Sequence, residues 1–542
     1  MGRKAGGAGR ALALVLAAAL AACTASRAPE SAAPPGPLTR AEATDYAETS
    51  TAADVAAFLG ALAADGLHLT AFGESAEGRD LPLAVWGAPD ASAGAVRATG
   101  KTRVLVFANI HAGEVAGKEA ALVLLRDLAA GRHRAWADSL VVLVAPLYNA
   151  DGNERVAYDN RPLQLGPVGG MGQRANAQGL DLNRDFTKLA APETRALVGL
   201  FGRYDPHLVL DLHTTNGTLM GYDLTYAPPL SPNTPDAIDR DLRERILPAV
   251  TDSLLGDGIA TWHYGNVPGA FGEATSAPRG WYSFSAQPRF STNYLGLRNR
   301  YGILSEAYSY ATFRDRVTAT RRFVEEVLDQ AWARATEIRR TTDEADRQSV
   351  AGRGLAVRAE FEALPRPVEI LLGEADTVAH PVTGAPMLQR RDVRRAEAMP
   401  AFVRFRAAET VEAPDRYLVH PGPHLEAARA LLDGHGVRYV EGDVGDASRQ
   451  RFRVDSVRVA ERPFQGVRQQ EVWGAWEAVP AETGPAPRRA PALVVPVGQP
   501  RGRLVVALLE PRSDDGVVAW GLVGADALRP GGFAPIERVP AE

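Results

Sequence analysis

The sequence predicts an α/β fold, in which a mostly parallel mixed sheet has helices on both faces, followed by a smaller β-rich domain. Over the first 350 residues, short apolar runs alternate with helical patterns, which is typical of buried parallel strands joined by crossovers. After residue 350, strand-like runs predominate. A chain of 542 residues also exceeds what one hydrophobic core usually serves, so we expect several domains.

Each element of the first domain follows from its residue pattern. The expected buried strands are 103–110 (RVLVFANI), 139–146 (SLVVLVAP), 207–212 (HLVLDL) and 301–305 (YGILS). Between the first two strands, helical spacing predicts a crossover helix, carried by Ala120, Val123, Leu124 and Leu128. Two further helices are expected, at 192–202 with a proline in its first turn and at 312–340 as the closing helix.

The second domain shows fewer helical patterns. We expect strands at 401–406, 416–420 and 503–509, one helix at 425–432, and a proline-rich surface loop at 481–491. The predicted boundaries are therefore an α/β domain at 40–350, preceded by the N-terminal segment, and a β-rich accessory domain at 351–542.

The N-terminus has the pattern of a signal peptide at residues 1–22, with three basic residues before an apolar stretch. Cys23 follows Leu-Ala-Ala, which resembles the lipobox of bacterial lipoproteins and implies lipidation of this cysteine. Residues 23–39, rich in alanine and proline, read as a tether. We expect an exported lipoprotein, anchored on the periplasmic or extracellular face of a membrane; a plain secretory signal is the alternative.

Composition restricts the classes of function. The 46% hydrophobic and 23% charged content is that of a folded globular chain, which argues against disorder and against a polytopic membrane protein. With 60 basic and 65 acidic residues the net charge is -5, and removing Arg3, Lys4 and Arg10 with the signal peptide makes it -8. No basic field attracts nucleic acid, so we expect no nucleic-acid partner.

Metal-ligand residues follow two of the predicted strands. His111 and Glu114 come directly after 103–110, and His213 comes directly after 207–212. Because open α/β sheets bind ligands at the carboxyl ends of their strands, these side chains are expected to meet at one edge. Two imidazoles and one carboxylate suit zinc, and three protein ligands leave a position for water, as in catalytic sites.

Further polar motifs follow in a fixed order: Asn-Ala-Asp-Gly at 149–152, Leu-Asp-Leu-Asn-Arg-Asp-Phe at 180–186 and Ile-Leu-Ser-Glu at 303–306. Together with His-x-x-Glu and the later histidine, they resemble the zinc metallocarboxypeptidase family of carboxypeptidase A over roughly residues 65–325. The chain departs from the family pattern at Ala150, where proline is usual.

The resemblance implies a role for each matching residue. His111, Glu114 and His213 would bind one zinc ion per chain, and Glu306 would be the catalytic glutamate. The other implied residues are Asn183 and Arg184 for the substrate carboxylate, Asp181 as hydrogen-bond partner of a ligand histidine, Arg79 in the substrate groove, Arg174 as oxyanion stabiliser, and Tyr282 or Tyr294 as the tyrosine that caps the substrate.

The implied function is zinc-dependent hydrolysis of C-terminal peptide bonds, with a peptide carrying a free C-terminal carboxylate as substrate. An amidase on cell-wall peptides or acyl-amino acids is one alternative. A catalytically silent zinc-binding or peptide-binding lipoprotein is another, and Glu306 discriminates against it, since a binding protein has no use for that residue. An iron oxygenase with two histidines and a carboxylate fits the ligands but not the Asp-x-Asn-Arg motif.

Overall fold

The computed structural model describes residues 36–63, 66–215, 217–270, 275–442, 448–479 and 491–541. Residues 36–542 form one compact unit. The predicted signal peptide, Cys23, most of the tether 23–39 and nearly all of the predicted loop 481–491 lie outside the described residues. Within the described ranges, no helix has both the length and the apolar character needed to cross a membrane.

An eight-stranded mixed sheet organises the first part of this unit, in the order β1-β2-β4-β3-β5-β9-β6-β7. Its central strands β4, β3, β5 and β9 run parallel, and β1 and β2 pair antiparallel with their neighbours. β6 pairs antiparallel with β9 and parallel with β7. The strands are β1 (Leu67–Glu74), β2 (Asp80–Trp86), β3 (Thr102–Ala108), β4 (Leu140–Ala145), β5 (Leu208–Thr214), β6 (Leu224–Ala227), β7 (Thr261–His263) and β9 (Tyr301–Ala307).

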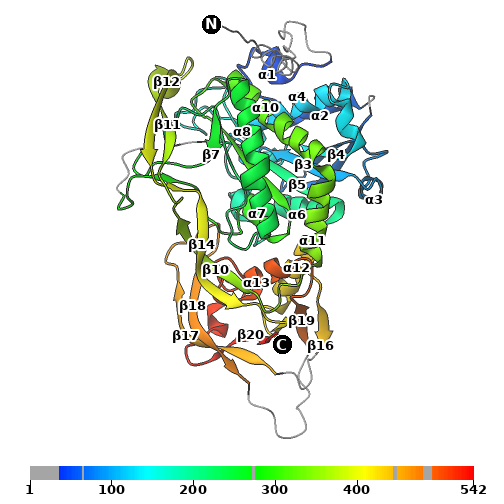
Figure 1. Cartoon of the computed structure of the whole chain (residues 1–542), viewed down its shortest axis with the longest axis vertical. Helices are drawn as coiled ribbons and strands as arrows, with labels where there is room; N and C mark the ends of the chain where they lie inside the picture. The colour runs from blue at the N-terminus through cyan, green and yellow to red at the C-terminus, as the bar shows by residue number, and fades with distance from the viewer. Residues whose placement is uncertain are drawn as a thin grey trace, which may run out of the picture. The chain divides into compact units, whose positions relative to one another are not determined.

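Helices cover both faces of this sheet, as the sequence predicts. One face carries α4 (Ala116–Ala129), α8 (Leu247–Gly256) and α10 (Phe313–Ala333), and Figure 1 shows α8 and α10 on its near side. The other face carries α6 (Pro192–Tyr204) and α9 (Ser291–Leu297), whose aromatic rings pack together. The remaining elements here are α1 (Arg40–Ala43), α2 (Ala52–Leu62), α3 (Ala93–Ala98), η1 (Arg134–Asp138), α5 (Ala150–Glu154), η2 (Leu182–Arg184), α7 (Asp236–Asp241), η3 (Leu242–Ile246) and β8 (Trp281–Tyr282).

The central strands form because their side chains are apolar on both faces. Every residue of β3, β4, β5 and β9 is buried. Such continuous hydrophobic runs are stable only between two helical layers, so the four predicted strands are confirmed.

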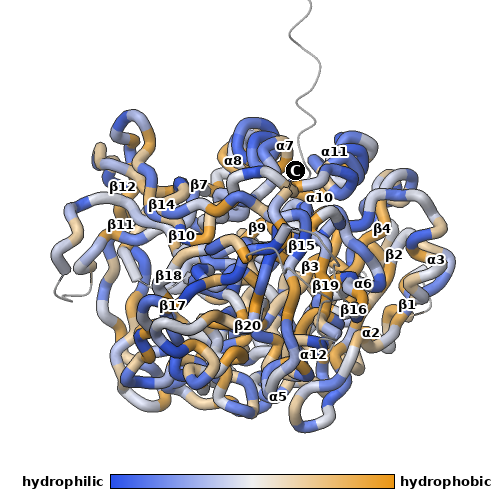
Figure 2. Tube along the Cα trace, turned by 90° about the horizontal axis from the view of Figure 1, so that it is seen from below, coloured by the Kyte–Doolittle hydropathy of each residue, from blue (hydrophilic) through white to orange (hydrophobic). Residues whose placement is uncertain are grey.

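The region after residue 350 is rich in antiparallel strands. Its strands are β10 (Gly354–Glu362), β11 (Val368–Ala379), β12 (Pro386–Met399), β13 (Ala401–Phe402), β14 (Arg404–Glu412), β15 (Arg416–Val419), β16 (Val440–Gly442), β17 (Gln450–Val459), β18 (Gln470–Ala478), β19 (Ala492–Pro496) and β20 (Phe533–Val539). β11 and β12 form a long two-stranded ribbon, and six others form a sheet ordered β16-β19-β15-β20-β17-β18. Figure 2 draws β17 largely in blue, in keeping with its arginines and its half-exposed surface.

Two expectations need correction, one for a strand and one for a helix. The run 503–509 is not a strand but the helix α13 (Gly502–Leu509), which is buried on all sides. An apolar run of this length fits a buried strand or a buried helix equally well, so its composition could not decide. The pattern at 312–340 is two helices, because α10 ends at Ala333 and α11 runs from Ala335 to Arg347.

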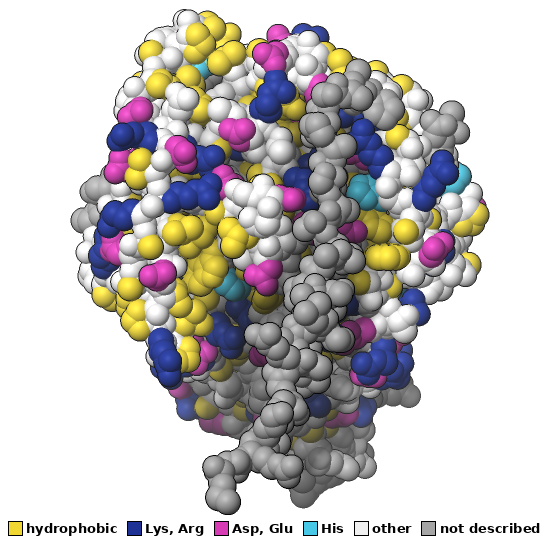
Figure 3. Space-filling model, turned by 45° about the horizontal axis from the view of Figure 1, so that its top comes forward, with side chains coloured by type: hydrophobic (Ala, Val, Ile, Leu, Met, Phe, Trp, Pro, Cys, Tyr) yellow, Lys and Arg dark blue, Asp and Glu magenta, His cyan; other side chains and the backbone are white. Residues whose placement is uncertain are grey.

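The helix at 425–432 is confirmed as α12 (Leu425–His435), and the strand at 416–420 as β15. The expected strand 401–406 is divided into β13 and β14. Helix α11 ends at Arg347 and β10 begins at Gly354, so the predicted boundary at residue 350 lies in the segment between them. The division into two domains stays a prediction. On the face drawn in Figure 3, basic and acidic side chains are interspersed.

Candidate functional site

The carboxyl ends of three neighbouring strands carry the candidate site. Strand β3 ends at Ala108, and Asn109, with φ of 67°, turns the chain so that His111 and Glu114 follow at the sheet edge. A left-handed backbone is uncommon outside glycine, and asparagine is one of the residues that adopt it most readily. His213 lies on β5 and is the direct register partner of Glu306 on β9, so parallel pairing brings these two side chains together.

The three predicted metal ligands form one buried cluster. Their ligand atoms all lie within 4.8 Å of one another. Glu114 lies between the two rings, with Oε1 3.0 Å from His111 Nδ1 and Oε2 2.9 Å from His213 Nδ1. Two imidazole nitrogens and a carboxylate, converging from one side, fit a catalytic zinc ion that keeps a further position open.

The far nitrogens of both rings face carboxylates. His111 Nε2 lies 3.0 Å from Asp181, and His213 Nε2 lies 3.0 Å from Asp211. A proton held on Nε2 by such a partner leaves the Nδ1 lone pair free for a metal and raises its basicity. The fit to zinc rests on this arrangement, in which Asp181 lies beside His111, one of the two ligand histidines that the resemblance allows as its partner.

The electrostatics of the cluster favour ionised groups. Burial opposes the charge on Glu114, but His111 and Arg161 hold the pKa of this carboxyl well below its usual range. Burial likewise opposes the charge on His213, but Asp211 and Glu114 raise its pKa well above the ordinary value. The cluster is therefore built to hold charges of both signs close together.

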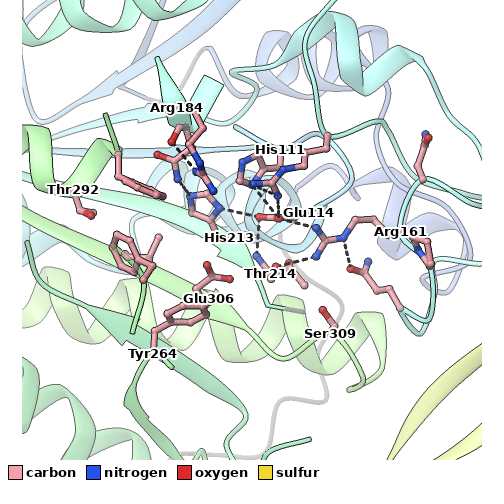
Figure 4. Close-up of a pocket in the computed structure, with 18 of the residues that line it drawn as sticks. His111, Glu114, Arg161, Arg184, His213, Thr214, Tyr264, Thr292, Glu306 and Ser309 are labelled. Carbon is pink, nitrogen blue, oxygen red and sulfur yellow. Dashed lines mark hydrogen bonds and ion pairs between the residues drawn. The ribbon is translucent and has the colours of Figure 1, made fainter. Parts of the chain in front are cut away.

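Glu306 differs from the other carboxylates of the site. Its Oε2 atom is buried without a hydrogen-bond partner among the described residues. Burial raises the pKa of Glu306 to about 8, an effect that His213 opposes and Glu114 reinforces. Figure 4 shows its carboxylate pointing into the space below Glu114 and His213. A carboxylate oxygen that makes no hydrogen bond, beside candidate metal ligands, is available to accept and return a proton.

A cavity of about 450 Å³ opens in front of the cluster. Asn183 and Arg184 line it next to the ligands, in the short helix η2 that follows Asp181. The guanidinium of Arg184 stacks 4.2 Å from the ring centre of Phe290 and donates from Nη1 to Asn183 O. The uncharged side chains that line the cavity include Phe284, Phe290, Thr292 and Leu304.

Arg174 also lines the cavity. Its guanidinium forms two hydrogen bonds to Asp181 Oδ2, at 3.0 and 2.8 Å, and Nη1 lies 3.3 Å from His111 Nδ1. The side chain is 42% exposed, so it presents charge to the cavity. The structure thus brings Arg174 to the predicted metal ligands, although its catalytic role stays a prediction.

Arg79 lies outside the cavity lining. Its Nη1 donates to Asp151 at 2.6 Å and to Glu77 at 2.5 Å, and the side chain is 37% exposed. Asp151 belongs to the Asn-Ala-Asp-Gly motif, whose Asn149 donates to Ile110 O and Arg174 O. The motif therefore links the loop before His111 to the segment of Arg174, and Arg79 is tied to it from the other side.

Neither tyrosine expected from spacing lies at the cavity. Tyr282 stacks on Phe402, and Tyr294 is fully buried with its hydroxyl 2.8 Å from His435. Tyr264 lines the cavity instead, and its pKa is raised by burial and by the nearby charge of Glu306.

Sequence reasoning missed three further site residues. Arg161 is buried and donates to Glu114 at 2.8 Å and to the carbonyl oxygens of Thr214 and Thr215. No recognised motif marked Arg161 or Tyr264. Asp211 carried a signal, because it is the one charged residue in the apolar strand HLVLDL, and an unexplained charge in a buried strand indicates a partner.

Comparisons with known proteins agree with this geometry. Residues 55–283 match the family model described as zinc carboxypeptidase. A probable carboxypeptidase 2 from Trichophyton verrucosum and a carboxypeptidase 2 from Trichophyton rubrum are each 36% identical over 161 residues, which is 28% of this chain. The match spans only about a quarter of these relatives, 27% and 26% of their length.

Among solved structures, a metallo-carboxypeptidase from Burkholderia cenocepacia aligns with 17% identity and a TM-score of 0.38, covering 52% of this chain and 68% of that one. A metallo-carboxypeptidase from Pseudomonas aeruginosa aligns with 17% identity and a TM-score of 0.38, covering 53% and 69%. The family match over residues 55–283 includes the three predicted metal ligands, so this part of the chain is similar to a zinc carboxypeptidase domain.

Proposed function

We propose that this protein is a zinc metallocarboxypeptidase that removes the last residue from peptides with a free C-terminal carboxylate. The observation that carries the proposal is the buried His111–Glu114–His213 cluster with Glu306 beside it in one cavity, where Glu306 Oε2 has no hydrogen-bond partner among the described residues. When bound to these three residues, zinc lowers the pKa of a coordinated water and polarises a carbonyl group.

The side chains supply the proton transfers. Glu306 takes a proton from the attacking water and then delivers it to the leaving amine, as a carboxylate near neutral pKa can do. Its direct register partner on β5 is His213, which keeps this base beside the metal ligands. Arg174 presents a positive charge next to His111, where negative charge develops on the carbonyl oxygen.

Recognition of the chain end is assigned to Arg184. Its guanidinium lies over Phe290 at the cavity wall, so its donors can grip a carboxylate in two parallel hydrogen bonds. Holding the terminal carboxylate at a fixed distance from the metal selects the last peptide bond for attack. Asn183 accepts the backbone N–H of Ser291 through Oδ1, which orients it beside Arg184.

The cavity wall also bears on which terminal residue is accepted. Phe284, Phe290, Thr292 and Leu304 carry no charge, and Thr292 and Leu304 are buried. Phe284, Phe290 and Leu304 make this part of the wall apolar, and apolar surface favours an apolar or aromatic side chain over a charged one, which would be desolvated against it. We propose a preference for neutral, apolar C-terminal residues.

Export and lipid anchoring remain proposals that rest on the N-terminal sequence alone. Residues 1–22 have the signal-peptide pattern and Cys23 follows a lipobox-like sequence. Mass spectrometry of Cys23 in the purified protein would test them: a diacylglyceryl modification supports a membrane anchor, and an unmodified thiol contradicts it.

The function is tested with zinc analysis and peptide cleavage on one preparation of the full chain. We expect one zinc per chain and release of the last residue from free-carboxylate peptides, but no cleavage of the same peptides with amidated C-termini. Glu306→Gln should lower kcat by about 10²–10⁴-fold while zinc stays bound, since general acid–base catalysis contributes about that much.

Other outcomes would redirect the assignment. Zinc binding without cleavage of any free peptide would favour an amidase or a silent binding protein, and wall peptides would then be the next substrates. Absence of zinc from both wild type and Glu306→Gln would refute the metal site.

A further inference from the structure

A two-residue turn from the C-terminal region reaches the candidate metal site. It lies at the tip of the loop between β17 and β18, where Phe464 and Val467 exchange two backbone hydrogen bonds, at 2.8 and 3.0 Å. Gln465 and Gly466 between them have φ of 51° and 75°, the signature of a type I′ turn. The first position of such turns favours asparagine, aspartate or glycine, so the turn itself does not explain glutamine there.

The side chain of Gln465 explains the choice. Its Oε1 accepts the backbone N–H of Asp181 at 2.8 Å, and its backbone oxygen accepts from Lys188 Nζ at 3.3 Å. Asparagine, one methylene shorter, would fall short of Asp181 from the same backbone position. Residues held in an unfavourable backbone conformation cluster at functional sites, and Gln465 fits this because its side chain contacts Asp181.

Asp181 connects this contact to the metal ligands. Its carboxylate lies 3.0 Å from His111 Nε2, receives two hydrogen bonds from Arg174, and accepts the backbone N–H of Asn183. Because one residue orients a ligand histidine, an arginine of the cavity and the start of η2, a small displacement of its backbone would move all three.

The turn is itself held firmly against the first region. Phe464 stacks on Trp520 with ring centres 6.3 Å apart, and Arg289 lies over both rings. Arg289 is fixed by Asp515, through Nε at 2.7 Å and its backbone N–H at 2.6 Å. Trp520 Nε1 donates to Thr187 Oγ1 at 3.1 Å, close to Asp185 and η2. These contacts hold the turn of Gln465 against the first region.

We propose that Gln465 is a positioning residue of the metal site, through which the C-terminal region holds Asp181 and, by way of Asp181, His111 and Arg174. The inference rests on the proposed function for its catalytic consequence. It makes the C-terminal region a part of the catalytic apparatus rather than an appended module.

The test uses Gln465→Asn and Gln465→Gly in the full chain, because both residues suit a type I′ turn and neither reaches Asp181. We expect unchanged or slightly raised thermal unfolding midpoints. Zinc affinity, measured by competition with a chelator, should weaken by about three- to tenfold. This is the effect expected when one hydrogen bond is lost to Asp181, which itself orients the ligand His111. In the metal-free protein, amide exchange in the peptide 176–188 should accelerate, and kcat should fall more than KM rises.

Arg468→Ala serves as the matched control, because Arg468 is an exposed residue of the same loop. It should change none of these quantities. Wild-type zinc affinity and wild-type exchange in both Gln465 variants would overturn the proposal, as would an equal loss in the control. A wild-type protein that binds zinc but cleaves no peptide would refute only the proposed function, since exchange and zinc affinity still decide on Gln465.

Discussion

The strands that present the candidate metal ligands are more deeply buried than the strands of the C-terminal region. The two sets also differ in whether residues at their ends belong to the candidate site. Residues of β3, β5 and β9 are buried throughout, and their carboxyl ends present His111, Glu114, His213 and Glu306. Strands β11, β12 and β17 are half exposed, and their contribution lies in ribbons and turns that contact the first region.

Two such contacts flank the cavity. The β11–β12 ribbon pairs with the first region at Leu163 and Met220, and Arg390 N donates to the carbonyl oxygen of Tyr310, a cavity residue. The β17–β18 turn supplies Gln465 to Asp181. The candidate metal ligands and Glu306 therefore lie on or directly after buried, parallel strands, whereas antiparallel elements without a recognisable motif contact the edge of the site.

The largest effect is expected where the two regions are joined by a buried ion pair. Arg289 and Asp515 are 6% and 0% exposed in their side chains. Asp515→Ala would leave a buried guanidinium without its carboxylate, which typically costs about 3–5 kcal/mol. We expect a loss of this size in the free energy of unfolding, measured by urea denaturation, together with faster amide exchange in both regions.

The double variant Arg289→Met with Asp515→Leu is the matched control, because removing both charges together is often close to neutral. If Asp515→Ala accelerates exchange only in the C-terminal region and leaves exchange around 285–297 unchanged, the ion pair does not couple the two regions and they unfold separately.

The second effect concerns the first region alone. Arg184→Ala should lower kcat/KM for free-carboxylate peptides by about 10- to 150-fold, corresponding to about 1.5–3 kcal/mol for hydrogen bonds to a charged group. Zinc content should be unchanged, because Arg184 does not contact the ligands. Arg184→Lys keeps the charge but loses the two-pronged geometry, so partial recovery is expected. Equal losses on substrates with and without a free carboxylate would contradict the assignment.

Much of the first region could be predicted from sequence because its signals are local. An apolar run such as 103–110 has few other ways to fold, and His111 and Glu114 stand immediately after it. Asp211 could have been added on the same reasoning, as a charge inside a buried strand. Glu306 also ends an apolar run, and its catalytic role is what the family resemblance implies.

The rest depended on contacts between distant parts of the chain. Arg161 reaches Glu114 from a segment without motif or periodicity, and Gln465 reaches Asp181 across 284 residues. The run 503–509 became a buried helix rather than a strand because the packing around it, and not its own composition, decided its form.

The smallest effect is expected at Arg79, although it lies in the first region and the family resemblance gives it a place in the substrate groove. Its guanidinium is engaged by Asp151 and Glu77 and lies outside the cavity lining. After Arg79→Ala, Asp151 still accepts from Ser75 Oγ and from the backbone N–H of Glu77. We therefore expect kcat/KM on blocked dipeptides to change by less than about threefold, in the range of an exposed ion pair.

Longer peptides make this prediction decisive, because a groove residue acts only on substrates that extend past the cavity. If KM rises tenfold or more for pentapeptides and not for dipeptides, Arg79 contacts substrate upstream of the scissile bond and the predicted role stands. If both substrates are unaffected while Gln465→Asn weakens zinc binding, a residue of the C-terminal region matters more to the site than Arg79 does. The C-terminal region would then contribute to the catalytic site and would not be merely accessory, although its strands are less buried than those of the first region.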